Sequence, residues 1–283
     1  MVEVSIIIPV YNCEKFIHDA IESALDQTAK NCEVVVIDDG STDNTTNILR
    51  SYGDRITCKI QERQGQAAAI NKGVKVSAGE YIAYLDSDDM CLPERLEEQL
   101  RYLHNHPDVG LVYSDSYQID ENARITSILK SRPMEQFSLL QSNYIARSSV
   151  MHRGNCLRHV GLFDVVITGS DDWDMWIRMS EQYRLGYIEK PLVKHRIHKN
   201  NISLTRPKKL GYGRWTRMII IQKCSRRQNK HLGLKVMLLR ARIVWVLGKI
   251  PVLGERIPRL WSGLEKVFIW IERTFIKNAL LNI

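Results

Sequence analysis

Short, uninterrupted apolar segments alternate along the chain with segments in which apolar residues recur every three to four positions. The apolar run at residues 5–10 is typical of a strand buried on both faces of a parallel sheet. Helical periodicity follows it over residues 16–25. Further buried strands are expected at residues 33–37, 57–61, 81–85 and 109–113. Strands that alternate with helices of this length predict a layered α/β domain with a mostly parallel sheet flanked by helices.

Single residues predict where some helices begin and end. Gly79 is expected to end the helix that precedes it, and Pro93 to begin the next one. The pattern becomes irregular over residues 115–150 and predicts no particular element there. Beyond this segment we expect a helix at residues 172–182 and a late strand at residues 192–197.

The balance of charge changes near residue 205. The chain has a net charge of +8. Residues 205–283 hold 18 Lys and Arg against 3 Asp and Glu, whereas the remainder holds 22 against 29. We therefore expect a folded domain at residues 1–204, with halves at about 1–115 and 116–204. A basic amphipathic helical tail is expected at residues 205–283.

The tail combines apolar stripes with basic residues, over residues 236–247 and again over 260–271. Its uncharged stretches reach about six residues, far short of the roughly 20 that a membrane span needs. Cationic amphipathic helices of this kind favour association with an anionic membrane surface. Packing against the folded domain or a partner protein is the alternative. Nucleic acid is not expected as a partner, because the tail has no base-stacking motif among its basic residues.

The cysteines and the start of the chain favour the cytoplasm. Six cysteines are scattered without a Cys-x-x-Cys pair, as is typical of reduced thiols in a cytosolic protein. The first residues lead into a strand of the fold and not into a signal peptide. We expect a cytoplasmic protein that is peripheral at the inner face of the membrane.

Acidic residues gather after two of the predicted strands. They are Asp38, Asp39 and Asp43 after the second strand, and Asp86, Asp88 and Asp89 after the fourth. Ligands of parallel α/β sheets bind beyond the carboxyl ends of the strands. Crowded carboxylates repel one another, so their grouping is explained if they bind a divalent cation or if some accept hydrogen bonds from a base or ribose. A cation held in this way neutralises charge on a departing diphosphate. Capping of the following helix is the alternative for Asp43 or Asp88 alone.

Four motifs occur in order along the chain. Residues 5–12 read Ser-Ile-Ile-Ile-Pro-Val-Tyr-Asn, 36–43 read Val-Ile-Asp-Asp-Gly-Ser-Thr-Asp, 71–73 read Asn-Lys-Gly ahead of Gly79, and 85–89 read Leu-Asp-Ser-Asp-Asp. Together they resemble the family 2 glycosyltransferases of the GT-A fold, over about residues 4–204. The resemblance implies a nucleotide-diphospho-sugar donor, a divalent metal (Mn²⁺ or Mg²⁺) at an Asp-x-Asp pair, and usually inversion at the anomeric carbon.

The resemblance also implies roles for residues on the donor side. Asp39 matches the partner of the nucleobase, and Pro9, Tyr11 and Asn12 line the same pocket. Asp86 and Asp88 match the Asp-x-Asp pair. Asp88 is the expected direct metal ligand, and Asp86 is expected to reach the ribose or a metal-bound water.

On the acceptor side, Gly161-Leu-Phe-Asp164 resembles the family's Gly-x-Phe-Asp turn. Residues 170–178 resemble its Glu-Asp-x-Asp-x-x-x-Arg segment, which makes Asp172 the expected catalytic base. An inverting transfer needs one carboxylate to take the proton of the acceptor hydroxyl. Asp171 stands where relatives usually have Glu, which leaves open which of the pair points inward. The alternative for Asp171 is the N-cap of the following helix.

Residues 195–203 resemble the family's Tyr-Arg-x-His-x-x-Asn-x-Ser loop. Arg196 and His198 are therefore candidates for contact with the phosphates or the metal. Relatives often carry Arg where this chain has Ile70. Arg63 or Lys72 is the candidate substitute, and the sequence does not choose between them.

The function that the resemblance implies is transfer of a sugar to an acceptor hydroxyl, from a UDP-sugar because UDP-sugars are the commonest donors of such relatives. The acceptor is expected to be a growing surface polysaccharide or a lipid-linked glycan. A sugar-phosphate nucleotidyltransferase is disfavoured, because such enzymes have a Gly-rich loop after the first strand and residues 9–13 contain no glycine. A non-catalytic nucleotide-binding protein on the same fold is the other alternative, and the presence of every required acidic residue counts against it.

Overall fold

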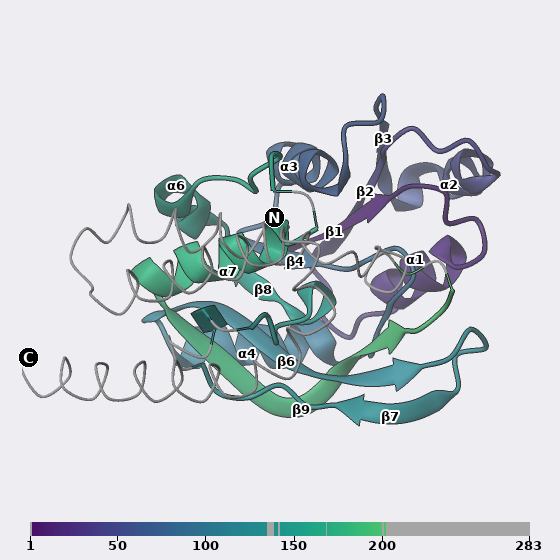
Figure 1. Cartoon of the computed structure of the whole chain (residues 1–283). Helices are drawn as coiled ribbons and strands as arrows, with labels where there is room; N and C mark the ends of the chain where they lie inside the picture. The colour runs from purple at the N-terminus through teal and green to yellow at the C-terminus, as the bar shows by residue number, and fades with distance from the viewer. Residues whose placement is uncertain (1, 135–138, 141, 168, 200, 202–283) are drawn as a thin grey trace, which may run out of the picture. The chain divides into compact units, whose positions relative to one another are not determined.

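Nine strands form one mixed sheet in the described part of the computed structural model (Figure 1). The structure describes residues 2–134, 139–140, 142–167, 169–199 and 201. The chain divides into two compact units, Met1–Ser203 and Leu204–Ile283. The tail predicted at residues 205–283, with its helices and its membrane association, lies outside the described residues.

The first half of the sheet is parallel. Its strands are β1 (Val4–Val10), β2 (Cys32–Asp38), β3 (Thr57–Ile60) and β4 (Tyr81–Tyr84), in the order β3-β2-β1-β4. The helices between them are α1 (Ile17–Leu25), α2 (Thr45–Ser51) and α3 (Gln66–Val76), with a 3₁₀ turn η1 (Gly53–Arg55). Ala69 of α3 packs with Ile37 on one face, and Ile21 of α1 packs with Ile8 on the other. These elements confirm the α/β prediction, and burial of all of β1 follows from the two covered faces.

The second half of the sheet departs from the parallel pattern. Its strands are β5 (Met90–Cys91), β6 (Val109–Ile119), β7 (Ile125–Leu129), β8 (Met151–Arg153) and β9 (Arg184–Arg196). β6 and β9 are parallel to each other, whereas β8 lies antiparallel between β4 and β6. β5 and β7 pair antiparallel with β9 and β6. The sheet is therefore mixed, and the expectation of a mostly parallel sheet describes its first half better than its second.

β6 and β9 are both longer than predicted. β6 continues past residue 113 because the polar segment Ser114–Ser116, which interrupts the apolar run, is itself buried. Asp115 Oδ1 accepts hydrogen bonds of 2.7 Å from Ser131 N and from Tyr187 Oη. A buried carboxylate is tolerated within a strand when it is hydrogen-bonded in this way, so a polar residue did not mark the end of β6.

Gly79 has a different role from the one expected. α3 ends at Val76 and is capped by Ser77, so Gly79 lies beyond the helix end. A Cβ atom at Gly79 would approach Ser5 N to 2.5 Å. The glycine is therefore required by the close approach of the chain to β1 and not by a left-handed helix cap.

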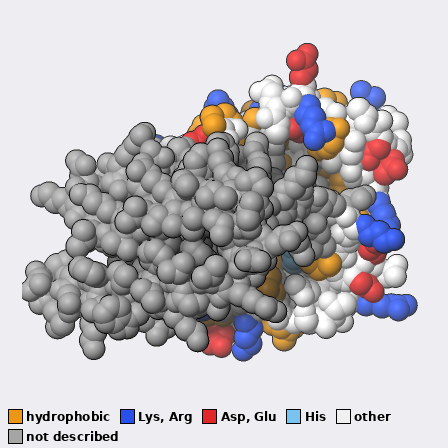
Figure 2. All heavy atoms as spheres, in the orientation of Figure 1, with side chains coloured by type: hydrophobic (Ala, Val, Ile, Leu, Met, Phe, Trp, Pro, Cys, Tyr) orange, Lys and Arg blue, Asp and Glu red, His pale blue; other side chains and the backbone are white. Residues whose placement is uncertain are grey.

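The remaining helices are α4 (Arg95–Asn105), α6 (Leu157–Val160) and α7 (Asp171–Gln182), with 3₁₀ turns η2 (Arg147–Ser149) and η3 (Gly154–Cys156). α4 begins shortly after Pro93, and α7 begins one residue before the predicted start. Trp176 of α7 packs on Tyr84 and Phe163. Among the described residues, no helix is long and apolar enough to cross a membrane. Acidic and basic side chains are interspersed over the part of the surface that is coloured in Figure 2.

Candidate functional site

The loops that follow β1 and β2 are joined by Asn12. This residue has a φ of 47°, in the left-handed region that asparagine tolerates. Its backbone N donates to Ser41 Oγ at 3.0 Å, and its Oδ1 accepts from Thr42 N at 2.7 Å. Asn12 therefore holds together two of the strand ends at which ligands of parallel sheets bind. The predicted contact of Asn12 with the nucleotide stays a prediction.

Two of the acidic residues after β2 stabilise loops. Asp38 is fully buried and accepts from Ser41 N at 2.9 Å and from Thr46 Oγ1 at 2.6 Å. Asp43 Oδ1 accepts from Thr45 N, at the start of α2, at 3.0 Å. Asp43 therefore stabilises the start of α2, whose N-cap residue is Asn44 and not Asp43.

Asp39 organises the segment between β3 and α3. Its carboxylate is 4% exposed and accepts from Gln61 Nε2 at 2.7 Å, from Gln64 N at 2.8 Å and from Gly65 N at 2.8 Å. Each carboxylate oxygen has two lone pairs, so Oδ2 keeps acceptor capacity beyond its bond from Gly65. The role of Asp39 at a nucleobase stays a prediction.

Arg63 and Lys72 differ in their surroundings. The exposed guanidinium of Arg63 lies 3.4 Å from the ring centroid of Tyr11, next to the residues that bind Asp39. Lys72 Nζ instead donates to Ile60 O at 3.0 Å. The geometry favours Arg63 over Lys72 as the basic residue of the donor pocket. Pro9 is buried within β1 opposite Ile37.

The loop after β4 is anchored by Asp89. This carboxylate is 1% exposed and accepts from Ser148 Oγ at 2.6 Å and from Arg196 N at 2.9 Å. It lies 3.1 Å from His195 Nδ1 and raises the pKa of His195 to about 9. The resulting ion pair fixes this loop to β9.

Asp88 lies beside His198, and the role of the two at a metal stays a prediction. Asp88 Oδ2 is 2.9 Å from His198 Nε2 and accepts from Asn201 Nδ2 at 3.2 Å. Two adjacent ligands of an octahedral ion, each at 2.0–2.1 Å, are about 3 Å apart. The pair therefore fits two neighbouring positions of such an ion. Within the described residues, no group of three or more His, Cys, Asp or Glu side chains is arranged to hold a metal.

Arg196 is placed differently from the expectation. Its side chain is 1% exposed and donates to Asp88 O at 2.9 Å, to Glu121 O at 3.0 Å and to Asp19 Oδ2 at 2.9 Å. The guanidinium also lies 4.6 Å from the ring centroid of Phe16. This geometry indicates that Arg196 holds the loop of Asp88 in place. It does not favour the phosphate contact that the resemblance of the loop implies.

On the acceptor side, the N-cap of α7 is Ser170, so the N-cap alternative for Asp171 is wrong. Asp171 is 1% exposed and accepts from Arg147 Nη2 at 3.3 Å. Asp172 is more accessible, and its Oδ2 accepts from Asn143 Nδ2 at 3.0 Å. Burial raises the pKa of Asp172, and the charge of Arg147 partly counteracts it. Asp172 is therefore the better placed of the two to meet an acceptor.

The same helix holds the turn at residues 161–164. Arg178 Nε donates to Asp174 Oδ2 at 2.8 Å, and its Nη2 donates to Leu162 O at 3.0 Å. Arg178 also donates to Val160 O. These contacts connect the two acceptor-side motifs, so Arg178 supports the position of the start of α7.

Arg147 is a site residue that the motifs missed. Its guanidinium donates from Nη1 to Asp86 Oδ1 at 3.2 Å and from Nη2 to Asp171 Oδ2 at 3.3 Å. Gln66 Nε2 also donates to Asp86 Oδ1, at 3.1 Å. Burial raises the pKa of Asp86 to about 7 against the opposing charge of Arg147. The sequence signal that could have identified Arg147 is its isolated charge within the apolar and small residues 145–151. A charge buried in such a segment requires charged or hydrogen-bonding partners.

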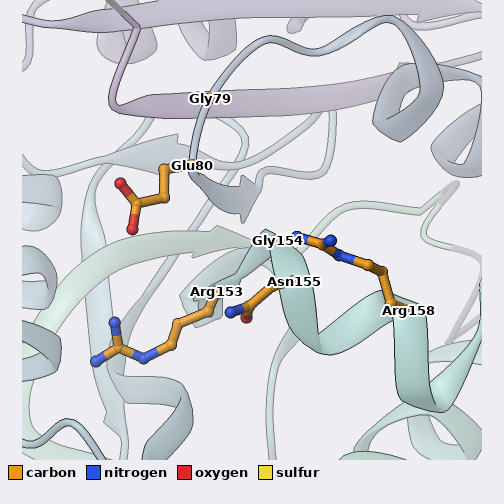
Figure 3. A pocket seen from close by; sticks show the side chains of 6 residues that line it. All are labelled: Gly79, Glu80, Arg153, Gly154, Asn155 and Arg158. Carbon is orange, nitrogen blue, oxygen red and sulfur yellow. The ribbon is translucent and has the colours of Figure 1, made fainter.

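A cavity of about 350 Å³ lies where β4 begins, at the end of this strand opposite to the loop of Asp86 and Asp88 (Figure 3). It is lined by Gly79, Glu80, Arg153, Gly154, Asn155 and Arg158. Arg153 donates to Val109 O at 3.0 Å and to Leu103 O at 2.6 Å, so its guanidinium joins elements of the fold. Figure 3 shows Arg153 and Arg158 on either side of Asn155. The carboxylates of the candidate site do not line this cavity.

The chain matches known proteins over most of its described length. The model of the family "Glycosyl transferase family 2" matches residues 5–166. An uncharacterized glycosyltransferase from Rickettsia typhi is 35% identical over 206 residues, which cover 69% of this chain and 64% of the relative. Chondroitin synthase from Escherichia coli is 32% identical over 204 residues, 71% of this chain and 30% of the relative. The chain thus spans less than two thirds of the length of either relative.

Among solved structures, residues 1–349 of S. aureus TarS in complex with UDP-GlcNAc superpose with a TM-score of 0.65. The match covers 89% of this chain and 77% of that one, at 20% sequence identity. At this identity the likeness concerns the fold, and it agrees with the GT-A expectation.

Proposed function

The chain belongs to glycosyl transferase family 2, and from that premise we propose that it transfers a sugar from a nucleotide-diphospho-sugar to an acceptor hydroxyl. The observation that carries the proposal is the link between the two carboxylate groups of the site. Arg147 joins Asp86, beside the Asp88 loop, to Asp171 at the start of α7. Donor-side and acceptor-side carboxylates therefore lie on one site, as a transfer between two substrates requires.

The donor is proposed to be a UDP-sugar. Asp39, held by three hydrogen bonds, is proposed to recognise the base, and Tyr11, with Arg63 stacked on it, is proposed to supply an aromatic surface and a positive charge nearby. The complex of TarS with UDP-GlcNAc supports UDP as the nucleotide. Asp86 is assigned to the ribose or to a metal-bound water.

Asp88 and His198 are proposed to hold a divalent cation, Mn²⁺ or Mg²⁺, together with oxygens of the diphosphate. When bound, such an ion neutralises charge that develops on the leaving nucleoside diphosphate. Asn201 and Arg196 keep Asp88 in place from the side of β9. Their contacts give Asp88 a defined position before any ligand is bound.

Asp172 is proposed as the general base. The acceptor oxygen forms a bond to the anomeric carbon, the bond from that carbon to the diphosphate oxygen breaks, and its electron pair leaves with the nucleotide. The hydroxyl proton passes to Asp172, whose carboxylate is oriented by Asn143. A single displacement of this kind inverts the anomeric carbon.

The acceptor is proposed to be a growing polysaccharide or a lipid-linked glycan. The similarity to chondroitin synthase supports a glycan polymer as the acceptor class. Association of the basic tail with an anionic membrane is proposed from the sequence alone. Removal of residues 230–283 is expected to release the protein from anionic liposomes in a flotation assay, and unchanged binding would refute this part.

Calorimetric titration of the full chain with UDP, GDP and dTDP tests the proposal, in Mn²⁺ and then with excess EDTA. We expect one nucleotide to bind in a metal-dependent manner and the binding to be lost in Asp88→Ala. Asp108→Asn is the matched control, because Asp108 is an exposed aspartate that pairs with Arg184. Absence of binding by all three nucleotides would favour a non-catalytic protein on this scaffold.

A further inference from the structure

Arg147 is a buried cation at the centre of the site. Its side chain is 7% exposed, and it comes from the 3₁₀ turn η2 (Arg147–Ser149), outside the loops that carry the motifs. A buried guanidinium is stable only when hydrogen-bonded acceptors compensate its loss of water. Burial lowers the pKa of Arg147, and Asp86, Asp171 and Asp172 together raise it by more. These carboxylates keep the guanidinium charged.

The partners of Arg147 distinguish it from Arg95, which is also buried, and from the half-buried Arg153. Arg95 donates to two backbone carbonyls, Tyr84 O and Val150 O, both at 3.0 Å. Arg153 likewise donates to the carbonyls of neighbouring elements. The two hydrogen bonds of Arg147 instead go to carboxylates of the site, one from each side. Arg95 and Arg153 hold backbone segments together, whereas Arg147 acts on charged groups.

The guanidinium of Arg147 has N–H groups that its two hydrogen bonds to carboxylates do not use. Each of its two bonds uses a separate terminal nitrogen, and neither carboxylate is bound in a two-bond fork. Its Nε is buried and has no hydrogen-bond partner within the described part of the chain. A guanidinium held in this way fixes the distance between two carboxylates while its charge acts on both.

The charge of Arg147 has its largest chemical consequence at Asp172. Burial raises the pKa of Asp172, the positive charge of Arg147 lowers it, and the negative charge of Asp171 raises it again. A base must be ionised to accept a proton, so a neighbouring cation extends the pH range in which Asp172 can act. Arg147 and Asp171 therefore have opposite effects on the pKa of Asp172.

We propose that Arg147 is a positioning residue that joins Asp86 on the donor side to Asp171 on the acceptor side and places its positive charge next to the proposed base, Asp172, the neighbour of Asp171 in the chain. The proposal rests on the proposed function in its assignment of Asp172 as the base. Its electrostatic part is a property of the free protein, so the two can be tested separately. Nothing in the sequence motifs assigns a role to Arg147.

The test measures the titration of Asp172 by carbon-detected NMR of the full chain labelled with ¹³C at the aspartate carboxyl groups. The Asp172 resonance is the one that disappears in Asp172→Asn. Arg147→Met is expected to move its midpoint up by about one pH unit, and Asp171→Asn to move it down. Arg147→Lys is expected to stay close to the wild type, because it keeps the charge. Arg153→Met, at a half-buried arginine away from the site, is the control and is expected to leave the midpoint unchanged.

Shifts of opposite sign in Arg147→Met and Asp171→Asn support the proposal. An unchanged midpoint in Arg147→Met, with a folded protein by circular dichroism, overturns it. If Arg147→Met does not fold, the absence of a downward shift in Asp171→Asn overturns the electrostatic opposition by itself.

Kinetics then separate this proposal from the proposed function. Release of UDP from UDP-N-acetylglucosamine is followed against pH, with Mn²⁺ present. Loss of activity in Asp172→Asn, with an acid limb of kcat that moves up about one pH unit in Arg147→Met, supports both. Activity retained in Asp172→Asn refutes the assignment of the base, whatever Arg147 does. Loss of activity in Asp172→Asn with an unmoved acid limb refutes only the role of Arg147, because a merely structural arginine would lower kcat equally at every pH.

Discussion

His152 is expected to make the stability of the unit Met1–Ser203 depend steeply on pH. The imidazole is fully buried in β8. Its Nδ1 lies 2.9 Å from Arg153 O, a carbonyl that can only accept, so Nδ1 carries the proton. Its Nε2, 2.7 Å from Tyr84 Oη, must then accept the tyrosine hydrogen. Both ring nitrogens are satisfied in the neutral form, and burial lowers the pKa of His152 from 6.5 to about 4.

The sign of the effect follows from proton linkage. Between pH 6.5 and pH 4 the unfolded chain binds a proton at His152 and the folded chain does not, so acid favours unfolding. The gap between the two pKa values corresponds to about 3 kcal/mol of unfolding free energy, present in full at pH 7 and lost progressively down to about pH 4. This is a large part of the roughly 5–15 kcal/mol that stabilises a typical domain.

Urea denaturation followed by tryptophan fluorescence at pH 7, 6, 5 and 4.5 measures the effect, with His152→Gln as the comparison. The wild type should lose about 1.4 kcal/mol more than the variant for each pH unit below 6.5. A ¹⁵N-imidazole titration should show His152 still neutral at pH 5. Parallel stability curves for the two proteins, or a His152 ring that is protonated at pH 6, would refute the reasoning.

Three further outcomes are expected. Asp172→Asn should lower kcat by about 10²–10⁴-fold while nucleotide affinity by calorimetry changes less than twofold, and a comparable loss of both would contradict a role confined to proton transfer. Gly79→Ala should lower the unfolding free energy by about 1–3 kcal/mol, because a Cβ atom would lie 2.5 Å from Ser5 N. Gly53→Ala is the comparison for backbone strain alone, because a Cβ atom at Gly53 would meet open space. Arg196→Met should weaken Mn²⁺-dependent nucleotide binding through displacement of Asp88, and binding equal to that of the wild type would remove Arg196 from the site.

The positions of the acidic residues proposed for the donor side could be predicted because the information for them is local. The apolar runs of β1, β2 and β4 each end directly in the polar loop that carries the chemistry, and parallel strands bring such loops to one edge. Asp39, Asp86 and Asp88 could therefore be placed on that edge from the order of residues alone. Asp172 depended on the resemblance of its segment to a known family, since a carboxylate at the start of a helix is commonplace.

The remaining features depend on partners far apart in the sequence. The polar residues Ser114–Ser116 look like the end of a strand until Ser131 and Tyr187 supply hydrogen bonds to Asp115. Arg196 resembles a phosphate ligand in its motif, but in the folded chain its guanidinium donates hydrogen bonds to Asp19 Oδ2 and to Glu121 O.

The sequence by itself determined the succession of buried strands and amphipathic helices and the loops that carry the acidic residues, because hydrophobic periodicity records which face of each element is buried. Only the tertiary structure decided which charges are paired, above all the bridge from Arg147 to Asp86 and Asp171. Periodicity carries no record of the partner, and a buried charge is defined by its partner.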